Sequence, residues 1–226
     1  MSQPLSFQQP TIVIGSADAA AYLSQMDIAI EHVVDAIETG EIQAANLTEH
    51  HPPTGAGLTR WIHVVGRLRH LLAGTNQWEG RNHRNRPFSI WADDSYTLSI
   101  VGGNEATGIA DHPTGPLAAN RKGKATSEAV NSTLPLITVE TLLGGGSTDD
   151  AEGWKSRPPR GAWFLLYHRD SESIRLEVSL PLGFDDGQFT GWKVRVILDE
   201  WRPEVVTARP NDIGGGDVDF EVAEAI

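Results

Sequence analysis

Three apolar segments in the second half of the chain constrain its fold most: residues 162–168, 174–182 and 191–198. Each has the length of a strand, and glycine, aspartate and serine residues separate them. Apolar and polar residues alternate in the second and third segments, which indicates strands with one buried face. The first segment is apolar on both faces, which is typical of a central strand. We therefore expect the three segments to form the core of an antiparallel sheet.

Two segments in the first half have the spacing of amphipathic helices. Apolar residues recur every three to four positions in residues 16–39 and again in residues 59–73. A glycine follows each segment, Gly40 and Gly74, and glycine commonly ends a helix. These two helices are predicted to cover the sheet. The chain is therefore predicted to be an α+β protein with two N-terminal helices and an antiparallel sheet of about five or six strands.

Shorter elements and long loops are predicted between these segments. Further strands are predicted at 11–14, 88–91, 96–101 and 134–143, and a short helix at 125–131. Loops are predicted at 41–57, 74–87 and 102–124, the last of which is rich in glycine.

The domain organisation predicted from composition is a single domain at 16–209. A flexible leader at 1–15 precedes it, and an acidic, mobile tail at 210–226 follows it. Residues 144–161 resemble a linker, with three consecutive glycines and the sequence Arg-Pro-Pro-Arg.

Composition excludes several classes of protein. The chain has no cysteine, so a disulfide scaffold, a cysteine nucleophile and a thiolate zinc site are excluded. No run of 18 apolar residues is present, so no membrane partner is expected. The N-terminus lacks the basic and apolar regions of a secretory signal, and we expect a cytoplasmic protein. P-loop, dinucleotide-binding and serine-hydrolase motifs are all absent.

Charge is strongly segregated along this acidic chain, whose net charge is −12. Residues 1–59 contain seven acids and no Lys or Arg, whereas residues 60–86 contain six Arg, three His and one acid. We call residues 60–86 the basic segment. Arginine binds phosphate through a planar fork of donors, and an exposed Trp78 would stack on a base.

The predicted binding residues lie in the basic segment and just before the helix predicted at 125–131. A helix N-terminus with basic neighbours favours anions. The set is Arg67, Arg69, Trp78, Arg81, Arg84, Arg86, Arg121, Lys122 and Lys124. The alternative is that the basic segment docks the acidic first helix, the tail or another protein. Trp154 and Trp201 lie in poorly periodic surroundings and are expected to be exposed.

A metal-dependent nuclease site is an alternative. It would use Asp93, Asp94 and Glu177 as ligands of Mg²⁺, with Lys193 on a neighbouring strand. A cross-strand ion pair of Glu177 with Lys193 or Arg195 is the simpler interpretation. Outside the nuclease alternative, no cofactor or metal is expected.

Two sequence blocks carry a resemblance to a known group. They are WFLLYHRDSESIRLEVSLPLGFDDGQFTGWKVRVIL and the central GGNEATG…PTGPLAANRKGKATSEAV. Together they resemble an uncharacterised family of bacterial proteins from mobile-element or phage-defence gene neighbourhoods, over roughly residues 58–200. Because charge is segregated along the chain and no catalytic set is complete, we expect a non-enzymatic recognition component that binds a protein partner or a nucleic-acid backbone through its basic residues. The resemblance implies that this component belongs to a bacterial antiviral defence or mobile-element system. It supplies no catalytic residue, and a structural subunit of an oligomer is a further alternative.

Overall fold

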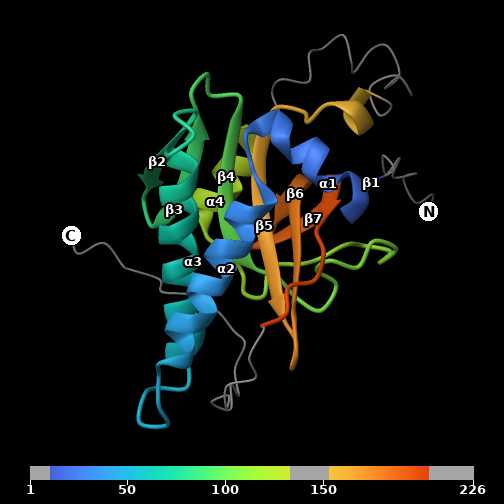
Figure 1. The fold of residues 1–226 in the computed structure, drawn as a ribbon. Helices are drawn as coiled ribbons and strands as arrows, with labels where there is room; N and C mark the ends of the chain where they lie inside the picture. The colour runs from blue at the N-terminus through green and yellow to red at the C-terminus, as the bar shows by residue number, and fades with distance from the viewer. Residues whose placement is uncertain (1–10, 133–152, 204–226) are drawn as a thin grey trace.

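The computed structural model describes residues 11–132 and 153–203 (Figure 1). Several predicted segments lie outside the described residues: the strand at 134–143, the acidic tail at 210–226, the first half of the linker-like segment (144–152) and residues 1–10 of the leader.

The described strands form one mixed sheet of seven strands in the order β1-β7-β6-β5-β4-β3-β2. Their bounds are β1 (Ile12–Ile14), β2 (Trp78–His83), β3 (Arg86–Trp91), β4 (Tyr96–Gly102), β5 (Gly161–Arg169), β6 (Ile174–Asp185) and β7 (Gln188–Ile197). β1 is parallel to β7 and β4 is parallel to β5, whereas the other neighbours are antiparallel. The α+β prediction is confirmed. The prediction of a purely antiparallel sheet with five or six strands is wrong in both respects.

Two parts of the chain explain the difference. β2 lies inside the segment 74–87, which is predicted to be a loop because most of its residues are polar. In the structure, most side chains of β2 are exposed. Its strand conformation comes from pairing with β3 along its whole length. β4 and β5 are parallel because the long connection between them, which contains α4 (Lys124–Ser132), crosses over before the chain returns to the sheet.

The N-terminal helices are α1 (Ser16–Leu23), the 3-10 turn η1 (Ser24–Met26), α2 (Ile30–Ala45) and α3 (Gly55–Ala73). The predicted helix at 16–39 is therefore interrupted, and Asp27 adopts a left-handed conformation at the break. Gly40 does not end the helix. A Cβ at Gly40 would lie 2.5 Å from Cγ2 of Val64, so glycine serves close packing of α2 on α3. No helix among the described residues is long and apolar enough to span a membrane.

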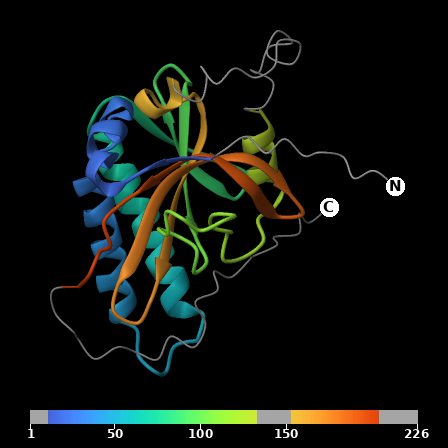
Figure 2. The same ribbon diagram turned by 90° about the vertical axis from the view of Figure 1, so that its right-hand side faces the viewer.

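The sheet separates two layers (Figure 2). The first face is covered by α1, α2 and α3, and the main core lies between them, with Leu68 and Trp163 fully buried. The second face is covered by α4 and by residues 103–123, which we call the glycine-rich loop. A smaller core there contains Phe164, Phe189 and Trp192.

Candidate functional site

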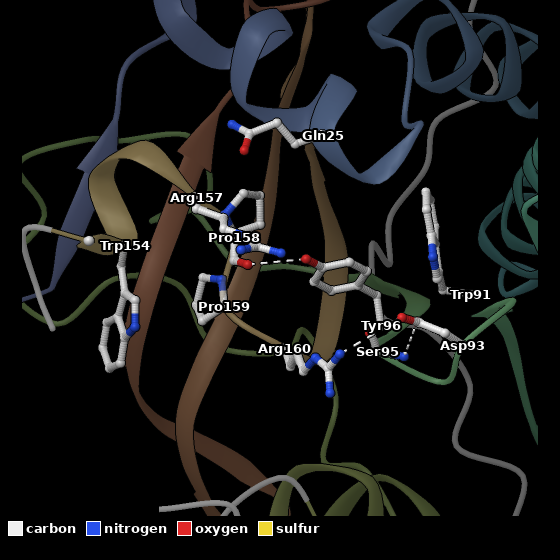
Figure 3. Close-up of a pocket in the computed structure, with 11 residues that line it drawn as sticks. Gln25, Trp91, Asp93, Ser95, Tyr96, Trp154, Arg157, Pro158, Pro159 and Arg160 are labelled. Carbon is white, nitrogen blue, oxygen red and sulfur yellow. Dashed lines mark hydrogen bonds and ion pairs between the residues drawn. The ribbon is translucent and has the colours of Figure 1, made fainter. Parts of the chain in front are cut away.

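A cavity of about 680 Å³ opens beside the turn between β3 and β4 (Figure 3). Its walls come from η1, from this turn and from residues 153–160. We call it the aromatic–arginine pocket, because its lining includes Trp91, Tyr96, Trp154, Arg157 and Arg160, together with Asp93. Trp154 and Trp91 lie at opposite sides of the pocket in Figure 3, with Tyr96 and the arginines between them.

The β3–β4 hairpin positions one side of the pocket. Trp91 ends β3 and Tyr96 begins β4, and their rings meet edge-on with centroids 5.8 Å apart. The turn between them is closed by a hydrogen bond of 2.9 Å from the Ser95 backbone N–H to Oδ1 of Asp93. The strands predicted at 88–91 and 96–101 are confirmed, and this turn fixes Trp91, Asp93 and Tyr96 at one end of the sheet.

The other side of the pocket is an irregular segment, residues 154–160, held by side-chain donors from distant elements. Four of its carbonyl groups accept such hydrogen bonds: Trp154 from Tyr22 Oη (2.7 Å), Ser156 from Gln25 Nε2 (3.0 Å), Pro158 from Tyr96 Oη (3.2 Å) and Pro159 from Trp163 Nε1 (3.1 Å). Proline has no N–H to place in a regular ladder, so these bonds to the carbonyls fix the backbone instead. Arg157 and Arg160 are thereby carried on an anchored backbone.

The charge at the rim of the pocket is predominantly positive. Nη2 of Arg160 lies 3.8 Å from Oδ2 of Asp93, and both side chains are exposed. Among the described residues, no hydrogen bond or ion pair involves the Arg157 guanidinium. Hydrogen bonds from Ser95 and, to a lesser extent, the charge of Arg160 hold the pKa of Asp93 below its usual value. The rim therefore presents two guanidinium groups and one ionised carboxylate.

The residues predicted to form a basic binding face are dispersed. On α3, Arg67 makes two hydrogen bonds of 2.7 Å to the carboxylate of Asp35 on α2, and the neighbouring Arg60 pairs with Glu41. This is the docking on the acidic first helix that we gave as the alternative. Arg69 turns towards β2 and donates to Oδ1 of Asn82 at 3.2 Å.

The hairpin of β2 and β3 contributes further predicted binding residues, most of them paired with acids. Arg81 pairs with Glu79 at 3.1 Å, and Arg84 pairs with Glu128 of α4 at 3.0 Å. Arg86 instead donates to the Ser99 hydroxyl at 2.8 Å.

Trp78 differs from its prediction, because it is only 4% exposed. Its indole N–H donates to the Met26 carbonyl at 2.8 Å, and its ring packs edge-on against Trp91. It therefore belongs to the core and offers no surface for stacking on a base.

The predicted anion site before α4 is also occupied by internal contacts. Arg121 pairs with Asp186 at 2.6 Å, and the Lys122 backbone N–H donates to the Gly187 carbonyl at 2.9 Å. Lys124 is exposed at the first turn of α4. These contacts join the glycine-rich loop to the turn between β6 and β7.

The residues of the nuclease alternative are not brought together. Glu177 is fully buried, and its carboxylate accepts from Arg195 Nε (3.1 Å) and Nη2 (2.5 Å), from the Ser179 hydroxyl (2.7 Å) and from the Gly108 N–H (2.8 Å). Both carboxylate oxygens are thus taken by protein donors. Asp93 lines the pocket, and no group of three metal-ligating side chains occurs within residues 11–132 and 153–203.

The partner of Glu177 is therefore Arg195, one of the two residues in the simpler interpretation, and not Lys193. Burial lowers the pKa of Lys193, which is partly enclosed on β7. A nuclease site that uses Glu177 would first have to break the buried ion pair.

Sequence reasoning missed most of the pocket. Trp154 was predicted to be exposed, and it is half-buried and lines the cavity. Arg157 and Arg160 were assigned to a linker-like segment, because prolines and glycines surround them. The available signal was a pair of aromatic residues, Trp91 and Tyr96, on either side of a short polar turn. Trp201, also predicted to be exposed, pairs with Ile174 through two backbone hydrogen bonds.

Comparison with protein-family models, with curated proteins and with solved structures found no match to this chain.

Proposed function

We propose that this protein is a non-enzymatic recognition protein that binds a short single strand of nucleic acid in the aromatic–arginine pocket. The observation that supports the proposal is the arrangement of the pocket, in which two tryptophans flank two arginines (Figure 3). Within the bacterial defence or mobile-element system that the sequence resemblance implies, it would act as the component that recognises such a strand.

The tryptophans supply two separate stacking surfaces. Trp91 and Trp154 are each half-buried, so part of each ring is fixed by the protein and part is accessible. Stacking of a base on an aromatic ring contributes about 1–3 kcal/mol and tolerates any base. Because the two rings lie on opposite sides of the pocket, they suit two bases of one strand better than a single mononucleotide.

The arginines lie where the linking phosphates of such a strand would pass. The guanidinium of Arg157 has no partner among the described residues, and that of Arg160 has only the long contact to Asp93. Exposed ion pairs are weak, so a phosphate can compete with Asp93 for Arg160. The Asp93 carboxylate is then available to accept a hydrogen bond from a base N–H group, such as N3–H of thymine.

The size and charge of the pocket fit binding without catalysis. A volume of about 680 Å³ lies in the range of roughly 300–1,000 Å³ that is typical of ligand pockets. Among the described residues, Asp93 is the only carboxylate that lines it, and its lowered pKa makes it a poor general base at neutral pH. Because the whole chain carries a charge of −12, its long-range field repels a nucleic acid, and the pocket has to act through short-range contacts.

The test is the binding of a fluorescently labelled octathymidylate, measured by anisotropy at several salt concentrations, with thymidine monophosphate as competitor. We expect the strand to bind more tightly than the monophosphate. With two phosphate contacts, the logarithm of the affinity should fall against the logarithm of salt with a slope of roughly −1.4, since each single-strand contact contributes about −0.7.

Variants locate the binding. Arg157→Ala and Arg160→Ala should each weaken binding by about tenfold or more and reduce the salt slope, because each removes a charged donor. Trp154→Leu should weaken binding without changing the slope. Arg202→Ala is the matched control, because Arg202 is an exposed arginine outside the pocket that pairs with Glu200. Equal binding by all four variants, or binding of an oligoglutamate peptide in preference to the strand, would refute the proposal.

A further inference from the structure

Arg86 is half-buried on the second face of the sheet, on the side of β3 away from α3. Its Nη1 donates to the Ser99 hydroxyl of β4 at 2.8 Å, and its guanidinium carbon lies 4.4 Å from the centre of the Phe88 ring. Its Nε is buried and finds no hydrogen-bond acceptor in residues 11–132 and 153–203. A hydroxyl and an aromatic ring are therefore the neighbours that stabilise this charge.

The absence of a carboxylate partner sets Arg86 apart from the other arginines of the same hairpin. Arg81 has Glu79, and Arg84 has Glu128. Among the described residues, no acid pairs with Arg86, and burial alone lowers its pKa. Burial of a charge is costly unless it is paired, so an unpaired guanidinium favours the approach of an anion.

The surroundings of Arg86 on this face are suited to an oxyanion. Arg86 shares the face with Ser99 and, two residues earlier on β4, with Thr97. The Thr97 hydroxyl is also buried, and no described residue forms a hydrogen bond with it. On β2, Gly80 and Asn82 contact Arg69 of α3 and therefore lie on the first face. Arg81, between them, lies on the second face, opposite Phe88 of β3. Two hydroxyl groups and a second arginine thus share this face of the sheet with the unpaired guanidinium, and the Ser99 hydroxyl is in direct contact with it.

We infer that Arg86 and Ser99 form a phosphate-binding site on the second face of the sheet, separate from the aromatic–arginine pocket. A guanidinium matches the geometry of phosphate oxygens, and a serine hydroxyl donates to them readily. The pocket lies at the opposite end of β3, because Arg86 begins this strand and Trp91 ends it. In the β2–β3 register, Trp91 lies opposite Trp78, and Trp78 faces η1 on the first face of the sheet. Trp91 and Arg86 therefore lie on opposite faces of β3. The inference therefore does not depend on the function proposed for the pocket.

The experiment measures thermal unfolding of the full chain in sodium phosphate and in sodium chloride of the same ionic strength. We expect phosphate to raise the unfolding temperature of the natural protein by roughly 3–6 °C when it is present at about ten times its Kd. Arg86→Met, which keeps most of the aliphatic volume, should abolish this rise. Arg84→Met is the matched control, since Arg84 already has an acid partner, and it should retain the rise.

Two further arms make the result unambiguous. Arg86→Lys, which keeps the charge but loses the planar fork, should show a smaller rise than the natural protein, and it serves if the methionine variant does not fold. An octathymidylate, added in an Arg157→Ala background, tests phosphate that belongs to a strand. An Arg86-dependent rise in the unfolding temperature with inorganic phosphate supports a site for free phosphate. Such a rise with octathymidylate but not with inorganic phosphate supports a site for the phosphate of a strand. An equal rise in the natural protein and in the Arg86 variants with both ligands would overturn the inference.

Discussion

The two faces of the central sheet are covered by different kinds of structure, and their chemistry differs accordingly. The first face, under α1, α2 and α3, is apolar, and its fully buried residues include Trp163 and Leu176. The second face, under the glycine-rich loop, carries the buried ion pair of Glu177 with Arg195. In the helix layer, the pair of Arg60 with Glu41 is largely buried and the pair of Asp35 with Arg67 is substantially exposed, and both join the side chains of α2 to those of α3.

Backbone hydrogen bonding explains this difference. A helix satisfies its own N–H and C=O groups, so it can cover an apolar face without polar partners. A buried loop leaves such groups without partners unless side chains supply them. Here Glu177 accepts from the Gly108 N–H at 2.8 Å, and Arg195 donates to the Ala106 carbonyl at 3.4 Å. The charged pair therefore docks the loop, and the comparison indicates that a loop cover requires buried polar residues beneath it.

The largest expected effect comes from removing one partner of this pair. Glu177→Leu would leave the Arg195 charge buried and unpaired, and it would also deprive the Gly108 N–H of its acceptor. We expect a loss of about 3–5 kcal/mol in the free energy of unfolding, measured by urea denaturation. Amide hydrogen exchange should rise first in the glycine-rich loop.

The double variant Glu177→Leu with Arg195→Met is the control. Replacement of a whole buried ion pair by apolar residues is often neutral, so the double variant should recover much of the lost stability. If it recovers nothing, the pair acts mainly as the hydrogen-bonding partner of the loop. If the single variant loses no stability at all, the contrast between the two faces is wrong.

A smaller effect is expected in the helix layer, where packing dominates. In Gly40→Ala, the added Cβ would lie 2.5 Å from Cγ2 of Val64 and 2.9 Å from the Arg60 carbonyl oxygen. The helices must separate to accept it, so we expect a loss of about 1–3 kcal/mol in urea denaturation.

Gly66→Ala in α3 is the matched control for Gly40→Ala. Apart from the adjacent residues and the local helix backbone, no described atom lies within 4 Å of a Cβ at Gly66, so the substitution should stabilise the helix by about 0.5–1 kcal/mol through its better helix propensity. Equal effects of the two substitutions would contradict close packing at Gly40.

How much of the fold could be predicted depends on where the information lies. β5, β6 and β7 follow from residue patterns that are local to each segment, and the hairpin of β3 and β4 follows from its turn. β2 could not be predicted, because its polar residues adopt a strand through pairing with β3. Gly40 was misread for a similar reason: its role depends on Val64, which lies on another helix.

The site was harder to predict than the fold. Charge along the sequence identified the basic segment, but it could not show that Asp35 and Glu128 lie beside Arg67 and Arg84. The availability of an arginine depends on its partners in space, and these partners come from other elements. Arg157, outside the basic segment, is available because no acid among the described residues pairs with it on its anchored, proline-containing segment.

The smallest expected effect concerns the exposed pair of Asp35 with Arg67 in the helix layer. Hydrogen bonding from Arg67 lowers the pKa of Asp35, so the pair stabilises the fold above the unfolded-state pKa of about 3.9 and loses this effect as the pH falls through the lower, folded-state pKa. In Asp35→Asn, the urea midpoint should fall slightly at neutral pH, and the difference from the natural protein should vanish on acidification.

Glu38→Gln is the control, because Glu38 is exposed on the same helix and forms no ion pair with a described residue, and it should show no such pH-dependent difference. Because the side chains of Arg67 and Asp35 are 37% and 41% exposed, solvent screens the pair, and the change must be far smaller than that of Glu177→Leu. If Asp35→Asn and Glu177→Leu lowered the free energy of unfolding by similar amounts, burial would not determine the strength of these ion pairs. The contrast between the two faces would then rest on the loop backbone alone.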